Sequence, residues 1–226
     1  MSIIEMRDVV KKYDNGTTAL RGVTVTIEPG EFAYIVGPSG AGKSTFIRSL
    51  YREVKVEKGS LTVAGFNLVK IKKRDIPLLR RNVGVVFQDY KLLPKKTVYE
   101  NIAYAMEVIG ENRRNIKKRV MEVLDLVGLK HKVRSFPNEL SGGERQRVSI
   151  VRALAVSPLY LIADEITSSL DIKHSHQVYQ YLRAYIQKKQ GIGVFVSHDP
   201  VIGSYADKVY KMEEGFLTEG TYKGEY

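Results

Sequence analysis

The chain has 226 residues, of which 43% are hydrophobic and 27% charged, a composition typical of one globular domain or of two small lobes. It contains no cysteine, which excludes disulfides and cysteine-bound metals and fits a reducing compartment. No segment approaches the roughly 20 apolar residues of a membrane span, and the first residues carry charges where a secretion signal needs an apolar run. We therefore expect any membrane role to act through a partner.

The net charge is +11, which permits an anionic partner such as nucleic acid or acidic lipid headgroups. The alternative is a solubilising surface together with residues that contact phosphates. Lysine and arginine are dense only at Lys70–Arg81 and Arg113–Arg119, and aromatic residues do not interleave with them as a stacking platform for bases requires. We favour the solubilising surface and expect no specific nucleic-acid partner.

Alternating and β-branched residues predict strands at 3–10 and 22–28. A short apolar run, Phe32–Val36, then enters a glycine-rich turn, and a helix is predicted over Thr45–Tyr51. Further strands are predicted at Ser60–Val63 and Val83–Phe87. This first part of the chain is therefore rich in strands, with one strand–turn–helix unit.

The pattern changes to helical over residues 91–134, where Asn115–Val127 carries apolar residues at helical spacing. Strands and helices then alternate again, with strands at Leu159–Ala163, Ile192–Val196 and Lys208–Met212 and a helix over His176–Lys189. Apolar strands that alternate with helices predict an α/β fold with a mostly parallel sheet covered on both faces.

The turn after Phe32–Val36 matches GxxxxGK[ST], the phosphate-loop motif. Glycines let successive backbone N–H groups face one anion, and the N-terminus of the next helix adds its dipole. We expect Lys43 to reach the β- and γ-phosphates of a nucleotide and Ser44 to contact Mg²⁺. The expected ATP-binding residues are Gly37, Pro38, Ser39, Gly40, Ala41, Gly42, Lys43, Ser44 and Thr45.

Two adjacent carboxylates follow the apolar strand Leu159–Ala163. Such a strand places Asp164 and Glu165 at the carboxyl edge of the sheet, where open α/β folds bind ligands. A phosphate loop needs a second metal contact and a group that positions water. We expect Asp164 to hold Mg²⁺ through water and Glu165 to orient or deprotonate the attacking water.

The segment Leu140–Arg147, LSGGERQR, resembles the LSGGQ signature of ABC ATPases, with Glu144 where glutamine is usual. Ser141 and the amides of Gly142 and Gly143 precede a helix expected to begin near Glu144, which makes a second anion cradle. One ATP has a single γ-phosphate, and a phosphate loop already covers it. Two cradles in one chain therefore predict ATP held between two subunits.

The resemblance assigns further roles by position. Tyr13 corresponds to the aromatic residue that stacks on adenine, and Gln88 to the Q-loop glutamine that contacts Mg²⁺ and water and relays to a membrane partner. Ser168–Asp171 resembles the D-loop at the dimer interface, with Asp171 in its last position, and His198 resembles the switch histidine at the γ-phosphate. The family usually has proline after the catalytic glutamate; Ile166 stands there and is expected to leave that loop freer.

The resemblance covers the whole chain and implies a single ABC ATPase domain over 1–226. Within it we expect a RecA-like core with an antiparallel β subdomain over about 1–90 and 135–226, and a helical subdomain over about 91–134. It also implies ATP and Mg²⁺ as cofactors, a head-to-tail dimer, and a position on the cytoplasmic face of the membrane.

Residues 34–45, 81–93 and 97–103 are similar to the FtsE family of cell-division ABC ATPases, which act at the division septum. This resemblance implies an FtsX-like membrane partner through which dimer closure regulates peptidoglycan hydrolysis. The run Ser168-Ser169 differs from the Gly-Asn expected in that family. The alternatives are the ATPase of a transporter for lipoprotein release, efflux or amino-acid import, a soluble ABC ATPase on nucleic acid, and a nucleotide-binding scaffold with little turnover.

Overall fold

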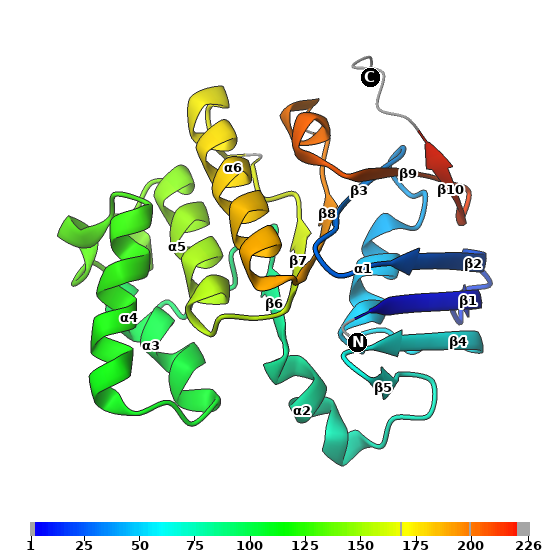
Figure 1. Cartoon of the computed structure of the whole chain (residues 1–226), viewed down its shortest axis with the longest axis horizontal. Helices are drawn as coiled ribbons and strands as arrows, with labels where there is room; N and C mark the ends of the chain where they lie inside the picture. The colour runs from blue at the N-terminus through cyan, green and yellow to red at the C-terminus, as the bar shows by residue number, and fades with distance from the viewer. Residues whose placement is uncertain (1–2, 168, 199, 221–226) are drawn as a thin grey trace.

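The computed structural model describes residues 3–167, 169–198 and 200–220. Figure 1 shows two sheets on one side of the molecule and a group of helices on the other. Among the described residues, no helix has both the length and the apolar character needed to cross a membrane.

The smaller sheet is antiparallel, and its strands lie in the order β2–β1–β4–β5. Their bounds are Thr18–Ile27 for β2, Ile4–Lys12 for β1, Lys58–Val63 for β4 and Phe66–Asn67 for β5. Residues of β1 and β2 alternate between buried and exposed along much of each strand, as expected for a sheet that covers a core on one face only.

The larger sheet has the order β10–β9–β3–β8–β7–β6 and is parallel except for the β9–β10 hairpin. Its strands are β3 (Phe32–Val36), β6 (Val83–Val86), β7 (Tyr160–Asp164), β8 (Ile192–Val196), β9 (Lys208–Glu213) and β10 (Phe216–Gly220). The central strands are almost entirely buried, because helices or the second sheet cover both of their faces.

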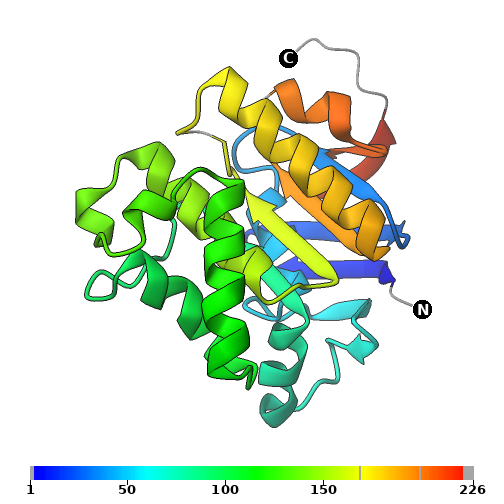
Figure 2. The same cartoon turned by 60° about the vertical axis from the view of Figure 1, so that its left-hand side comes forward.

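Three helices accompany the sheets: α1 (Lys43–Leu50), α2 (Ile76–Arg81) and α6 (Ile172–Lys189). The helical group contains α3 (Val98–Val108), α4 (Arg113–Leu126) and α5 (Gly142–Ala155). Short 3-10 helices lie at Lys73–Asp75, Lys130–Lys132, Pro137–Glu139 and Pro200–Tyr205. Figure 2 shows α4 and α5 beside the sheet, with α6 crossing the sheet face.

The core divides into three clusters. Ala33 and Ile35 of β3 point into a cluster shared with α1 and the antiparallel sheet, whereas Phe32 and Tyr34 point into one shared with α5 and α6. This alternation is the period-two pattern of a strand. The third cluster joins α3, α4 and α5. Helix α5 therefore packs both against the other helices and against the larger sheet.

The predicted fold class is confirmed: a mostly parallel sheet with helices on both faces, an antiparallel β part and a helical part. The boundaries differ in detail. The signature helix begins at Gly142 instead of near Glu144, and α6 begins at Ile172, four residues before the predicted start. The sequence interpretation missed α2, β5 and β10. Helical packing also continues past the predicted end at 134, because α5 completes the third cluster.

Candidate active site

Four parallel strands end at one edge of the larger sheet, and each leads directly into a segment singled out from the sequence. β3 leads into the phosphate loop, β8 into His198, β7 into Asp164 and Glu165, and β6 into Gln88. Because β3, β8, β7 and β6 are consecutive neighbours, these segments meet along a single edge. The Glu165 amide continues the ladder by donating to the Val196 carbonyl at 2.8 Å.

The phosphate loop requires glycine at two positions for steric reasons. A Cβ on Gly37 would lie 2.0 Å from the Met212 carbonyl oxygen, and one on Gly42 would lie 2.3 Å from the Ala19 carbonyl oxygen. Gly42 also has φ near 110°, a conformation that L side chains rarely adopt. The loop is therefore held close against the backbone of β9 and β2.

Lys43 lies inside the curl of this loop and is only 7% exposed. Its Nζ donates to the carbonyl oxygens of Gly37 at 2.6 Å and Pro38 at 2.8 Å. Burial lowers the pKa of Lys43, while the nearby Glu165 and Asp164 carboxylates oppose that shift. The ammonium group therefore contacts the loop and lies near the two carboxylates.

The two carboxylates differ in their contacts. Asp164 ends β7 and accepts a hydrogen bond from the Ser44 hydroxyl; burial raises its pKa, and Arg48, Lys43 and Ser44 oppose the shift. Glu165 has φ near 52°, an uncommon conformation for a non-glycine residue. Burial also raises the pKa of Glu165, and His198 opposes this, so Glu165 is a better proton acceptor than an exposed glutamate.

His198 lies against Glu165. Its backbone N–H donates to Glu165 Oε2 at 3.3 Å, and its Nε2 is 3.4 Å from Glu165 Oε1. The imidazole is 62% exposed, whereas the Glu165 side chain is 16% exposed. The histidine therefore borders solvent at the mouth of the site, and the glutamate lies deeper.

A pocket of about 490 Å³ lies over this edge. Its lining includes most of the predicted site residues, namely Tyr13, Ser39, Gly40, Gly42, Lys43, Ser44, Thr45, Gln88, Asp164, Glu165 and His198. Gly37, Pro38 and Ala41 do not line it; they shape the loop through their backbone. Thr17, Ala19 and Val196 also line it, and no motif marks them, because they contribute only by proximity in the fold.

Tyr13 stands beside the phosphate loop at one end of the pocket. Its hydroxyl lies 3.0 Å from the Thr45 hydroxyl, and the Lys11 ammonium lies 4.9 Å from the centre of its ring. The ring is partly buried. Because Lys11 lies over one face of this ring, an adenine base could stack on the opposite face, or on the same face once Lys11 has moved away.

The signature residues form a helix start elsewhere on the chain. Ser141 caps α5, its Oγ accepts from the Glu144 amide at 3.2 Å, and Glu144 Oε2 accepts from the Ser141 amide at 2.8 Å. This reciprocal capping lowers the pKa of Glu144 and gives a structural reason for glutamate there. Among the described residues that line the pocket at the sheet edge, none belongs to Ser141–Glu144.

The segment after Glu165 is anchored more firmly than the sequence suggested. Ile166 is 1% exposed and packs into the cluster shared with α5 and α6, and the Thr167 hydroxyl lies 2.9 Å from the Tyr179 hydroxyl. The first two residues of the loop that was expected to be freer, Ile166 and Thr167, are therefore buried. Asp171 caps α6 by accepting from the His174 amide; Ser168 of the predicted D-loop lies outside the described residues.

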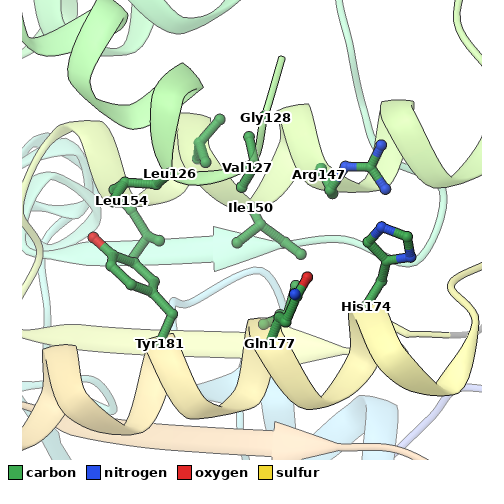
Figure 3. Close-up of a pocket in the computed structure, with 11 residues that line it drawn as sticks. Leu126, Val127, Gly128, Arg147, Ile150, Leu154, His174, Gln177 and Tyr181 are labelled. Atoms are coloured by element: carbon green, nitrogen blue, oxygen red, sulfur yellow. The ribbon is translucent and has the colours of Figure 1, made fainter. Parts of the chain in front are cut away.

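A second pocket, of about 320 Å³, lies between α4, α5 and α6. Figure 3 shows Arg147 and His174 facing each other at one end and Tyr181 near Leu154 at the other. Its described lining includes no residue of the phosphate loop or of the Asp164–Glu165 pair, so it is separate from the site at the sheet edge.

Comparison with known proteins agrees with this arrangement. A family model described as ABC transporter matches residues 20–168. The chain is 70% identical over 226 residues to the cell division ATP-binding protein FtsE of Streptococcus pneumoniae serotype 2 strain D39, covering 100% of this chain and 98% of the relative. It is 50% identical over 224 residues to FtsE of Bacillus subtilis strain 168, covering 99% and 98%.

A more distant relative, the methionine import ATP-binding protein MetN of Helicobacter pylori strain 26695, is 38% identical over 219 residues, covering 96% of this chain and 67% of that protein. Among solved structures, the dimeric post-hydrolysis state of the ATP-binding cassette MJ0796 bound to ADP and Pi superposes with a TM-score of 0.90 at 30% identity, covering 98% of this chain and 100% of that one. The chain therefore belongs to the ABC ATPases and, within them, to the FtsE family.

Proposed function

We propose that this chain is the ATP-hydrolysing subunit of an FtsEX-type complex, in which two copies close on MgATP and act through an FtsX-like membrane protein to regulate peptidoglycan hydrolysis. The observation that carries the chemistry is the single sheet edge that joins the phosphate loop, Asp164, Glu165, Gln88 and His198 around one pocket. The full-length similarity to proteins named cell division ATP-binding protein supports the cellular role.

The oxygen atoms at this edge fit Mg²⁺. The Ser44 hydroxyl and the Asp164 carboxylate already contact each other, and Gln88 lines the same pocket. No group of three or more His, Asp or Glu side chains in the described part of the chain could hold a metal alone. This suits an ion whose remaining ligands are phosphate oxygens and water. When bound, Mg²⁺ would neutralise charge on the β- and γ-phosphates.

The side chains then divide the remaining work. Lys43 and the loop amides bind the phosphates, and Tyr13 stacks on adenine. Glu165 accepts a proton from the attacking water, or orients it, and His198 lies beside Glu165 to contact the γ-phosphate. Because His198 contacts Glu165 already, a bound γ-phosphate would compete for this imidazole and free the glutamate for water.

The second anion cradle is the basis for the dimer. Ser141, Gly142, Gly143 and Glu144 begin α5 outside the nucleotide-sized pocket, so they would cover ATP bound to a second copy in a head-to-tail pair. Asp171, at the start of α6, would lie at that interface. ATP bound across the interface stabilises the closed dimer, and hydrolysis removes the γ-phosphate that links the two subunits.

A groove of about 680 Å³ supports the proposal that a membrane protein binds this chain. It runs between α2, β6 and α3, beside the segment that follows Gln88. Tyr104 and Val108 are each 48% exposed there, and Arg80, Arg81 and Lys91 also line it. An amphipathic cytoplasmic segment of the membrane protein, apolar on one face and flanked by acidic residues, matches this combination of apolar surface and positive charge.

The test is affinity purification of the Glu165→Gln variant with MgATP from solubilised native membranes, followed by mass spectrometry. An FtsX-like protein with few spans and a large extracellular loop is the expected product. A many-span permease would move the function to transport, as in the methionine-import relative. A Val108→Glu variant is the matched control: it should lose the membrane protein and still bind ATP, because Val108 lies outside the nucleotide pocket.

A further inference from the structure

Tyr90 lies two residues after Gln88, and its side chain and backbone contact two other functional segments. Its hydroxyl lies 2.7 Å from the Ser169 hydroxyl in the D-loop. Its carbonyl oxygen accepts from Ser149 Oγ at 3.1 Å and from Arg152 Nη2 at 2.9 Å, both on α5. We propose that Tyr90 is a positioning residue that couples the segment facing the membrane partner to the D-loop and to the signature helix.

The backbone around Tyr90 is held in an uncommon conformation. Tyr90 has φ near 61° and Lys91 has φ near 47°, and two consecutive non-glycine residues in the left-handed region are strained. The bonds from Ser149 and Arg152 hold this turn against α5, and Arg152 also donates to the Lys91 carbonyl at 2.6 Å. Such a turn persists only while its neighbours hold it, which suits a segment that a docking partner displaces.

The tyrosine side chain reaches the point where the D-loop meets the signature. A Cβ added at Gly142 would lie 3.7 Å from the Tyr90 hydroxyl and 3.6 Å from Ser169 Cβ. One added at Gly143 would lie 3.2 Å from the Ser169 carbonyl oxygen. The Tyr90–Ser169 contact therefore sits directly against the glycines that are proposed to cover the ATP of the second copy.

Arg145 also lies against the Tyr90 ring. Its guanidinium lies 5.5 Å from the centre of the Tyr90 ring, close enough for a cation–π contact. Its Nε is buried and has no hydrogen-bond partner among the described residues. Movement of Tyr90 would thus shift both Ser169 and the first turn of α5.

Tyr90 and Ser169 do not line the nucleotide pocket. Loss of their contact should therefore leave ATP binding by a single chain unchanged and slow the steps that need the D-loop and signature in place. This inference rests on the proposed function, since it assumes that Ser141–Glu144 and the D-loop act on ATP across a dimer.

The experiment compares wild type, Tyr90→Phe, Ser169→Ala and the double variant as full-length chains, measuring ATP affinity and steady-state turnover. We expect ATP affinity within about twofold of wild type and kcat lowered about three- to tenfold by either change, the effect of one lost hydrogen bond. The double variant should be no slower than the slower single variant, because both changes remove the same contact.

Tyr185→Phe is the matched control. It also removes a tyrosine hydroxyl that makes a hydrogen bond, since the Tyr185 hydroxyl donates to the Pro158 carbonyl at 2.9 Å. This change should leave kcat unchanged. Unchanged kcat in Tyr90→Phe, or effects of the two single changes that multiply, would overturn the coupling. A wild-type chain that binds no ATP would instead contradict the proposed function, so the two failures are distinguishable.

Discussion

Replacing Ile166 by alanine tests whether burial of this side chain restricts the backbone after Glu165, as proline does at this position in related enzymes. Ile166 is 1% exposed and packs between β7, α5 and α6. Truncating a buried isoleucine to alanine lowers the free energy of unfolding by about 2–5 kcal/mol. A chain of this size loses about 2–4 °C of melting temperature per kcal/mol. Ile166→Ala should therefore melt about 4–20 °C below wild type, and Ile166→Val about 1–6 °C below it.

The functional effect should separate turnover from binding. Ile166 does not line the nucleotide pocket, so ATP affinity should stay near that of wild type, while kcat falls because the adjacent Glu165 is less well fixed. Ile116→Ala on α4 is the control: Ile116 is 3% exposed in the helical cluster and should lower stability without lowering kcat at temperatures where the chain is folded. Melting within about 1 °C of wild type for Ile166→Ala would refute the anchoring argument.

Two further predictions concern binding and stability. Lys43→Ala should abolish measurable ATP binding in calorimetry, since Lys43 is the buried ammonium of the loop; retained micromolar affinity would contradict the role of the loop. Asp207→Asn should lower the free energy of unfolding at pH 7 by about 1–3 kcal/mol. It removes a carboxylate that accepts two hydrogen bonds from the Arg183 guanidinium, at 2.7 and 2.6 Å. Burial by itself would raise the pKa of Asp207, but Arg183 and the Phe32 amide outweigh it and lower the pKa. The stabilisation is therefore fully present above the ordinary aspartate pKa of about 3.9 and is lost as the pH falls through the lower folded value. The melting difference between wild type and Asp207→Asn should shrink below about pH 4, and a difference that grows there would contradict this sign.

Local sequence motifs predicted most of the residues that line the pocket at the sheet edge. The GxxxxGK[ST] pattern and the Asp164–Glu165 pair each follow an apolar strand, and parallel strands bring their carboxyl ends to one edge. What the sequence could not show is proximity across the fold. Ala19 enters the pocket only because β2 lies against the phosphate loop.

The burial of Ile166, and the anchoring of the backbone that follows from it, could not be predicted from the sequence either. Local propensity treats isoleucine as less restrictive than proline, but the tertiary packing of α5 and α6 over this position decides how firmly the loop is held. The Tyr90–Ser169 contact joins residues 79 positions apart, and no local pattern marks it. Short elements such as β5, with two residues, leave too little periodicity to detect.

In the proposed dimer, ATP is held between two copies, with the phosphate loop of one and the signature of the other. The most direct measurement is the solution mass of the 25.6 kDa chain as Glu165→Gln, with and without MgATP, beside the same variant carrying Ser141→Arg. Glu165→Gln should be a dimer only with ATP, and addition of Ser141→Arg should keep ATP binding and leave a monomer. An ATP-bound monomer of Glu165→Gln, or a dimer unaffected by Ser141→Arg, would contradict an ATP site shared by two copies.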